Sequence, residues 1–350
     1  MHIDEILKIM VERNASDLHL RVGSPPMIRI FGKLSAIAKW PDLTVEDSES
    51  ILKSLATSAN QAVFAENLEL DCAYSASGIG RFRVNVFRQR GTLAFVLRLV
   101  PTVIPTIDQL NLPLLCKELI RKPRGMIIVA GSAGSGKSTT MAAMINHLNE
   151  TESRNVITIE DPIEYLHRNN KCIIAQRDLG DDTKSFEDAL IHTLRQDPDV
   201  IYIGEMRDLT TISMAIRAAE TGHLVLGTLH TTSAPGTIDR IIDIYPANQQ
   251  DQIRLQLSQV LEAVLMQCLL PRSDGTGRAG AFEILLATPA VRNLIRQGKS
   301  HEIPNVMQLG MQDGMQTLDQ SLAKLVKSQL VSRENALMKS SNPVQLLKLL

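Results

Sequence analysis

The spacing of apolar residues changes along the chain, and the change predicts two domains. In the first hundred residues a helical spacing over 3–12 and another at about 45–56 are combined with short alternating stretches, such as 82–86. Alternation with a period of two is typical of strands with one buried face, and a spacing of three to four is typical of helices. These patterns predict a mixed α/β domain over 1–100.

Beyond a stretch with three prolines at 101–113, the pattern becomes one of short, continuously apolar runs separated by helical segments. The runs lie at 126–131, 156–159, 172–175, 200–204 and 224–229. Strands that are apolar on both faces and alternate with helices are typical of a buried parallel sheet. The proline-containing stretch 101–113 is therefore predicted to be a linker, and a sheet-based core is predicted over 114–288.

The last part of the chain, 289–350, is predicted to be helical. Thr288 and Pro289 form a typical helix start and Gly298 a typical stop. A second helix is indicated by a stripe of apolar residues, namely Leu318, Leu322, Leu325 and Val326.

The clearest chemical signal is a glycine-rich loop between an apolar strand and a helix. It fits the pattern G-x-x-x-x-G-K-[ST] in full, with Gly131, Ser132, Ala133, Gly134, Ser135, Gly136, Lys137 and Ser138, and Thr139 follows it. In such a loop the backbone N–H groups bind phosphate oxygens, the lysine reaches the β- and γ-phosphates, and the Ser138 hydroxyl binds Mg²⁺. A glycine-rich turn with an incidental lysine is the alternative, and the flanking strand and helix argue against it.

Acidic residues follow two of the predicted strands. Glu205 comes directly after 200–204, and Glu160, Asp161 and Glu164 follow 157–159. Open parallel sheets place their ligands at the carboxyl ends of strands, and a nucleotide hydrolase needs a carboxylate to orient or deprotonate water. A single acid after a strand could equally lie in a solvated loop or cap a helix. Two such strands beside a phosphate loop favour catalysis.

A further predicted strand has a histidine at each end, His223 before it and His230 after it. His230 is predicted to share a sheet edge with Glu205, where it could sense a γ-phosphate. A structural histidine is the alternative for both. Metal binding is not indicated, because no pair of histidines and no nearby cysteine has ligand spacing.

Composition excludes several function classes. The chain carries 37 Lys and Arg against 38 Asp and Glu, a net charge of −1, and only 3 % aromatic residues, which argues against nucleic-acid binding. Four cysteines without CxxC spacing indicate neither a zinc site nor disulfides. Without a signal peptide or an apolar run of about 20 residues, the expected location is the cytoplasm.

Taken together, the motifs resemble those of the secretion-type ATPases of type IV pili and type II secretion, over nearly the whole chain. The phosphate loop at 131–138, the acidic box at 157–165, the second acidic strand at 197–208 and the histidine box at 220–234 all match, as does 15–29 near the start. Within this family, 290–296 (AVRNLIR) resembles the motif of the pilus retraction members, with Val for Ile. The other branches commonly have a longer N-terminal region and a four-cysteine site; we expect neither here, which favours the retraction branch.

The resemblance implies an N-terminal PAS-like α+β domain, a RecA-like P-loop ATPase domain and a helical C-terminal tail. It also implies a homohexamer that binds ATP and Mg²⁺ between subunits. Glu205 would be the catalytic carboxylate, Glu164 would support the metal or the water, and His223 and His230 would line the site. Arg83 and Arg98 match the family's arginines that complete the site across the interface, with Arg81 a lesser candidate.

The arginine assignment agrees with the local pattern, because Arg81 and Arg83 share one face of a predicted strand. Guanidinium groups suit the charge that develops on a transferred phosphoryl group. A solvated strand face or an RNA-binding patch is the alternative. Two departures from the family pattern are Gln297, where Glu is frequent, and the lack of an Asp directly before Glu205, which leaves Ser138 as the main metal ligand.

The sequence thus predicts a cytoplasmic hexameric motor at the inner face of the membrane that powers pilus retraction, with the segment 101–113 as its hinge. Expected partners are an inner-membrane pilus platform protein and a paralogous retraction ATPase, and no nucleic acid is expected. The alternatives are an assembly or accessory retraction ATPase of the same family, a nucleic-acid translocase on a RecA-like core, and a scaffold that binds ATP without turnover.

Overall fold

The computed structural model describes the chain except residues 1, 31 and 39, and the chain divides into two compact units. Unit 1 comprises the chain up to Val103 together with Pro162–Leu166, and unit 2 comprises Ile104–Asp161 and His167–Leu350. The chain therefore crosses between the units after Val103, after Asp161 and after Leu166. The first crossing lies within 101–113, whereas the return of 162–166 to unit 1 is not among the sequence predictions.

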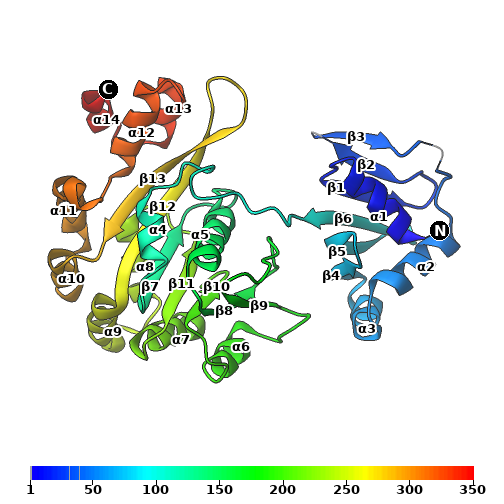
Figure 1. The fold of residues 1–350 in the computed structure, drawn as a ribbon, viewed down its shortest axis with the longest axis horizontal. Coiled ribbons are helices and arrows are strands. Elements are labelled where there is room, and N and C mark those ends of the chain that lie inside the picture. The colour runs from blue at the N-terminus through cyan, green and yellow to red at the C-terminus, as the bar shows by residue number, and fades with distance from the viewer. Residues whose placement is uncertain (1, 31, 39) are drawn as a thin grey trace. The chain divides into compact units, whose positions relative to one another are not determined.

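Unit 1 is an antiparallel sheet with helices on one face (Figure 1). The sheet has the strand order β3-β2-β1-β6-β5-β4. The strands are β1 (Asp17–Arg21), β2 (Met27–Ile30), β3 (Lys33–Ala36), β4 (Glu69–Ala76), β5 (Gly80–Gln89) and β6 (Thr92–Val100), and the helices are α1 (Ile3–Glu12), α2 (Val45–Leu55) and α3 (Ser58–Asn67).

The two faces of this sheet differ because side chains alternate along each strand. Phe82, Val84 and Val86 of β5 are fully buried and share one core with Ile6 of α1 and Ile51 of α2. The opposite face carries polar alternates that include Arg81 and Arg83 of β5 and Arg98 of β6. The backbone of the sheet thus fixes the positions of these arginines on the face that the helices leave uncovered.

Unit 2 contains a mostly parallel sheet with the order β13-β12-β7-β11-β10-β8-β9, in which β12 and β13 pair antiparallel. The strands are β7 (Gly125–Ala130), β8 (Asn155–Glu160), β9 (Ile173–Asp178), β10 (Val200–Ile203), β11 (Leu224–Leu229), β12 (Leu261–Pro271) and β13 (Arg278–Leu286). The helices are α4 (Leu115–Leu119), α5 (Lys137–Thr151), α6 (Phe186–Thr193), α7 (Leu209–Glu220), α8 (Ala234–Asp243) and α9 (Ala247–Val260), followed by α10 (Pro289–Arg296), α11 (Ile303–Leu309), α12 (Leu318–Lys327), α13 (Arg333–Lys339) and α14 (Pro343–Leu349).

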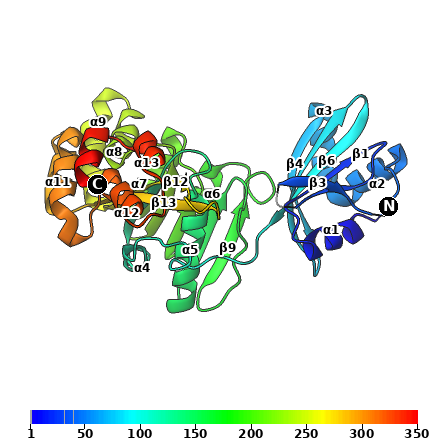
Figure 2. The ribbon, with the colours of Figure 1, turned by 90° about the horizontal axis from the view of Figure 1, so that it is seen from above.

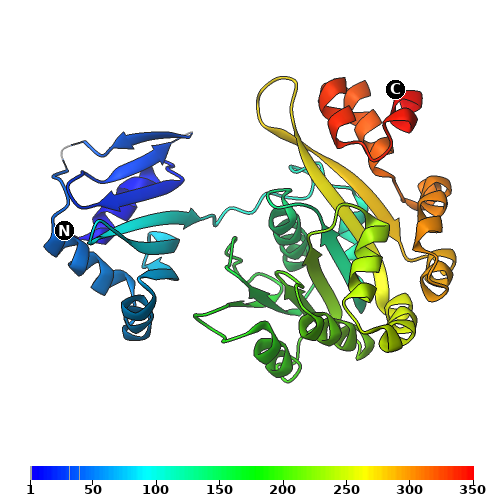
Figure 3. The same ribbon diagram turned by 180° about the vertical axis from the view of Figure 1, so that it is seen from behind.

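Helices cover both faces of this sheet, which explains why β7 is buried at every position (Figures 2 and 3). Ile127 and Val129 of β7 pack in one core with α4 and α5, whereas Met126 and Ile128 pack in another with α6 to α9. The helical C-terminal region is confirmed, and α10 begins and ends where the pattern predicts, with Thr288 as its N-cap.

Two strand regions of unit 2 differ from the sequence prediction. The run 172–175 is a strand, but it is not buried as predicted, because β9 lies at the edge of the sheet and Ile173 is 65 % exposed. The hairpin of β12 and β13 extends the sheet beyond the predicted runs. In the described part of the chain, no helix is long and apolar enough to cross a membrane.

Candidate active site

The predicted phosphate loop joins the carboxyl end of β7 to the start of α5, as the sequence indicates. Gly131 and Gly136 have φ angles of 148° and 91°, which favour glycine. A Cβ at Gly131 would meet the carbonyl oxygen of Gln267, and one at Gly136 would lie 3.1 Å from the Gln267 amide nitrogen. The loop therefore needs glycine both for its backbone conformation and for the close approach of β12.

Gln267 supports the loop from β12, in the middle of an apolar strand. Its side chain donates to the Ser135 carbonyl oxygen at 2.7 Å and accepts from the Thr140 hydroxyl at 2.8 Å. Both contacts are buried, so the amide holds the loop and the first turn of α5 together. Gln267 was not among the predicted site residues. A polar residue inside an apolar strand is the sequence signal that could have identified it.

A cavity of about 710 Å³ opens beside the loop. Its walls include Gly136 of the loop, Thr139 of α5, Asn111 of the 101–113 segment and Arg278 of β13. Arg278 also donates to the Gly134 carbonyl oxygen at 3.3 Å, a contact that sequence reasoning did not foresee. The volume and the mixed polar and apolar lining suit a small organic ligand that continues from a phosphate group.

Lys137 lies within its own loop. Its ammonium donates to the carbonyl oxygens of Gly131 and Ser132 at 2.9 and 3.1 Å and lies 3.4 Å from His230 Nδ1. The Ser135 hydroxyl is buried without a hydrogen-bond partner in the described residues. A buried hydroxyl of this kind beside an ammonium group and the N-terminus of α5 suits a phosphate oxygen.

Glu205 and His230 come together at the carboxyl edge of the sheet. A hydrogen bond of 3.0 Å from the Met206 N–H to the Thr228 carbonyl oxygen ties the turn after β10 to β11. Glu205 Oε1 then lies 3.1 Å from His230 Nε2, and its Oε2 lies 2.6 Å from Arg207 Nη2. The side chains of Lys137, His230 and Glu205 thus form one continuous polar contact.

The electrostatics of Glu205 follow from these neighbours. Burial raises the pKa of Glu205, but the hydrogen bond from Arg207 and the charges of His230 and Arg207 outweigh it, so its pKa lies below the ordinary value. Glu205 is therefore ionised at neutral pH. Arg207, which sequence reasoning also missed, keeps it a weak base in this arrangement.

His223 lies apart from this set. It precedes β11, whereas His230 follows it, so six residues of strand separate the two histidines by about 20 Å. Its Nδ1 atom lies 2.9 Å from the Ala218 carbonyl oxygen and 3.2 Å from the Thr221 hydroxyl oxygen, at the end of α7. Within one chain the structure therefore does not bring His223 to the phosphate loop, because a strand presents its two ends to opposite edges of the sheet.

The acids after β8 are divided between the two units. Glu160 is buried at the end of β8 in unit 2, where it accepts hydrogen bonds from Thr158 and Gln176 at 2.6 and 3.1 Å. Glu164 lies in 162–166 and belongs to unit 1. Glu160 and Glu164 therefore belong to different units, although they are only four positions apart in sequence.

Arg83, Arg98 and Glu164 line one cavity of about 440 Å³ in unit 1, together with Ser16 and Tyr165. Arg83 and Arg98 stand directly opposite each other on β5 and β6. The structure thus brings together the two arginines and the acid that the resemblance singled out. Arg81 lies two positions from Arg83 on the same strand and is not among the cavity residues.

The described residues contain no cluster of three or more His, Cys, Asp or Glu side chains that could hold a metal ion. Ser138 is partly exposed at the first turn of α5. Mg²⁺ in nucleotide sites is usually held by one or two protein oxygens together with phosphates and water. The donor set is therefore compatible with Mg²⁺ that arrives with a nucleotide.

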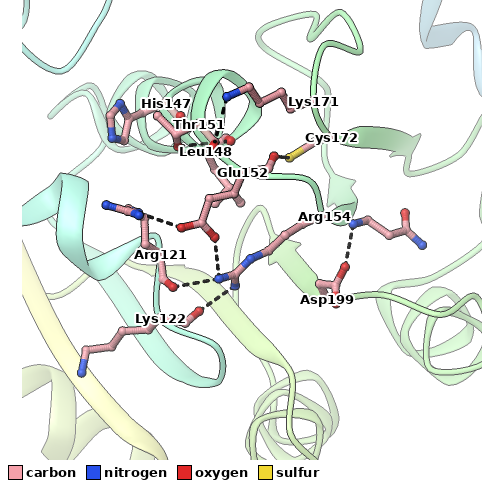
Figure 4. A network of polar contacts seen from close by, with 11 residues as sticks. Arg121, Lys122, His147, Leu148, Thr151, Glu152, Arg154, Lys171, Cys172 and Asp199 are labelled. Atoms are coloured by element: carbon pink, nitrogen blue, oxygen red, sulfur yellow. Dashed lines mark hydrogen bonds and ion pairs between the residues drawn. The ribbon is translucent and has the colours of Figure 1, made fainter.

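A polar network lies around the C-terminal end of α5 (Figure 4). Glu152 accepts from Arg121 at 2.7 Å and pairs with Arg154 at 2.7 Å. Arg154 donates to the carbonyl oxygens of Arg121 and Lys122, both at 2.8 Å. The Arg121 hydrogen bond, followed by that of Arg154, keeps the pKa of Glu152 below its ordinary value.

This network continues to the AVRNLIR helix, α10. Lys122 Nζ lies 2.6 Å from Glu262 Oε2, and Arg292 Nη2 lies 3.0 Å from Glu262 Oε1. Arg292 also donates to the carbonyl oxygens of Ser258 and Gln259 at 2.6 and 2.8 Å, which satisfies the end of α9. Arg292 therefore fastens α10 to the rest of unit 2.

A parallel sheet with a glycine-rich loop, a loop lysine and an acid at the neighbouring strand end defines a P-loop nucleoside triphosphatase. Residues 109–338 match the model of the family described as type II/IV secretion system protein. The chain is 45 % identical to the type IV pilus retractation ATPase PilT of Pseudomonas aeruginosa over 98 % of this chain and 99 % of that protein.

Two further comparisons agree. The chain is 43 % identical to the type IV pilus ATPase PilU of P. aeruginosa, over 96 % of this chain and 88 % of that protein. A crystal structure of the pilus retraction motor PilT with bound ADP has 47 % sequence identity, covers 99 % of both chains and gives a TM-score of 0.92. The chain belongs to the type II/IV secretion system ATPase family, and the family and fold expected from its sequence are confirmed.

Proposed function

We propose that this chain is an ATP-hydrolysing motor that powers the retraction of a type IV pilus. The observation that carries the proposal is the contact from Lys137 through His230 to Glu205 beside the phosphate loop. It occurs in a chain that matches pilus retraction ATPases over nearly its full length. Binding alone needs the loop, whereas hydrolysis also needs the carboxylate.

The residues of unit 2 support a direct hydrolytic step. The triphosphate draws Lys137 away from the Gly131 and Ser132 carbonyl oxygens and provides the Ser135 hydroxyl with a partner. Water attacks the γ-phosphorus, the bond to the bridging oxygen of ADP breaks, and Glu205 accepts a proton from the water. Because Arg207 holds Glu205 as a weak base, we infer that this ion pair loosens before turnover.

Ser138 is the residue that would hold Mg²⁺ through its hydroxyl, together with the phosphates. The ion supplies charge neutralisation on the β- and γ-phosphates when it is bound. Lys137 and the backbone N–H groups of the loop orient the same phosphates, and His230 contacts both Lys137 and Glu205.

The residues of unit 1 act on the developing charge. Arg83 and Arg98 have the guanidinium geometry that suits a phosphoryl group, and Glu164 in the same cavity supports the water or the metal. These groups complete the site in a homohexamer in which nucleotide lies between subunits. In that assembly His223 contributes at a subunit boundary, and relative motion of the units, with a hinge at 101–113, is the mechanical output.

The motor works in the cytoplasm at the inner face of the membrane, against the pilus platform protein. The similarity to PilU favours a second candidate within the same system, an accessory retraction ATPase that works with a paralogue. The two roles differ in what deletion does. Loss of the main motor abolishes retraction, whereas loss of an accessory motor weakens it and leaves the paralogue active.

The proposal is tested by purifying the chain, measuring phosphate release from MgATP and expressing it in a retraction-deficient strain. The expected result is ATP hydrolysis by a hexamer and restored twitching motility with normal surface pili. Hydrolysis that depends on DNA would instead support a translocase. ATP binding without single-turnover cleavage would support a scaffold, and either result overturns the motor.

A further inference from the structure

A row of charged side chains crosses the sheet of unit 1. Asp17 on β1 stands directly opposite Arg29 on β2 and Arg98 on β6, and Arg98 stands opposite Arg83 on β5. Residues in direct register share one face of a sheet and approach closely. Three cations in one row repel one another, and Asp17 is the acid placed among them.

Asp17 holds Arg98 by one particular atom. Asp17 Oδ1 accepts from Arg98 Nε at 2.8 Å, and Oδ2 accepts from the Ser16 hydroxyl at 2.8 Å. Arg29 Nε is more distant, at 3.9 Å from Oδ2. The strongest contact of the row is therefore directed at Arg98 rather than shared equally among the cations.

The burial of the two partners differs in a way that points to function. The Asp17 side chain is 7 % exposed, whereas the Arg98 side chain is 65 % exposed. A guanidinium held at Nε still presents both Nη groups, and in the described residues these have no hydrogen-bond partner. Arg98 also lines the 440 Å³ cavity with Arg83 and Glu164.

Burial raises the pKa of Asp17, but the hydrogen bonds from Ser16 and Arg98 outweigh it, and the pKa lies below its ordinary value. The carboxylate is therefore charged at any pH at which ATP hydrolysis is measured. Arg83, by contrast, makes no ion pair or side-chain hydrogen bond in the part of the chain described.

We propose that Asp17 is a positioning residue, which fixes Arg98 through Nε so that both Nη groups face a nucleotide phosphate. The inference rests on the proposed function, because it takes Arg98 as a phosphate contact. A long side chain with many rotamers must otherwise be ordered in each binding event. Asp17 holds the Arg98 side chain in one conformation before the nucleotide binds, and it acts on the reaction only through Arg98.

The test compares four full-length variants, Asp17→Asn, Arg98→Ala, the double variant and Asp71→Asn. Asp71 is the matched control, because it also accepts a side-chain hydrogen bond on this sheet, from Asn85 at 3.2 Å, and does not line the cavity. Steady-state hydrolysis of MgATP gives kcat and KM, and thermal unfolding checks that each variant is folded.

The expected result is a roughly tenfold lower kcat/KM for Asp17→Asn and a larger loss for Arg98→Ala, while Asp71→Asn stays within about twofold of wild type. The double variant should match Arg98→Ala within about twofold, because Asp17 has no route to the phosphate once Arg98 is gone. If Asp17 had only a structural role, Asp17→Asn would lower kcat/KM by the same factor in the wild type and in Arg98→Ala. That outcome overturns the inference.

The experiment distinguishes failure of the proposed function from failure of the positioning role of Asp17. Wild-type protein without ATPase activity contradicts the proposed function, and Arg98→Ala with full activity contradicts the role of Arg98. Wild-type activity that falls in Arg98→Ala but not in a folded Asp17→Asn variant contradicts the positioning role alone. If Asp17→Asn does not fold, Asp17→Glu replaces it, since the longer side chain keeps the charge but displaces the carboxylate, and the same comparison with Arg98→Ala decides.

Discussion

His230 Nε2 lies 3.1 Å from Glu205 Oε1, while its Nδ1 faces the Lys137 ammonium. Because the ammonium can only donate a hydrogen bond, its contact is with the imidazole nitrogen Nδ1, while Nε2 of the same ring faces the carboxylate. The histidine thus contacts both the loop lysine and the Glu205 carboxylate, and it links the phosphate loop to the acid at the end of β10.

Replacing Glu205 by Gln should lower kcat by on the order of 10²–10³, because the amide cannot take a proton from water. Affinity for ADP should change little, since the loop is untouched. Phosphate release and fluorescent ADP binding measure the two effects. Glu187→Gln, an exposed change on α6, is the control, and an unchanged rate in Glu205→Gln would remove Glu205 from the mechanism.

Gly136→Ala should weaken nucleotide binding and destabilise the fold. The left-handed φ of 91° costs an L-residue about 1–2 kcal/mol, and the new Cβ displaces Gln267. Gly222→Ala is the matched control, because its φ is 107° but a Cβ there meets no atom within 4 Å. Both variants should melt earlier, and only Gly136→Ala should lose ADP affinity. Equal affinities would show that Gln267 does not govern the loop.

The two arginines of α10 should differ in their contribution to stability. Arg292→Ala removes hydrogen bonds to two carbonyl oxygens and to Glu262, so the free energy of unfolding should fall by about 1–3 kcal/mol. Arg296 is exposed, and Arg296→Ala should change it by less than about 0.5 kcal/mol. Denaturant unfolding of both variants measures this. Similar values would mean that Arg292 does not fasten α10.

The low pKa of Glu205 predicts a pH dependence of stability. A carboxyl group whose pKa is depressed in the folded state stabilises the fold above its ordinary value of 4.5, and this contribution is lost as the pH falls through the folded-state pKa. The difference in unfolding free energy between wild type and Glu205→Gln should therefore be constant at neutral pH and shrink below about pH 4.5. A difference that grows on acidification would contradict the assigned ion pair.

Local sequence patterns predicted the phosphate loop, the buried strands and α10, because each of these features depends on residues that are adjacent in sequence. Gln267 and the pairing of Asp17 with Arg98 were not predicted, because they depend on contacts between residues that are distant in sequence. Gln267 supports Ser135 from 132 positions away, and Asp17 and Arg98 are separated by 81. Only the sheet shows that the two ends of β11 face opposite edges, which places His223 away from the phosphate loop within one chain, and its role in the site stays a prediction.

The segment 162–166 has a mechanical consequence. Leu166 donates its N–H to the Pro101 carbonyl oxygen at 3.2 Å, and Ile163 is 4 % exposed, so this segment is fastened to unit 1 while its neighbours on both sides belong to unit 2. Because the chain crosses between the units three times, rotation about the backbone of one crossing is limited by the covalent connection through the other two.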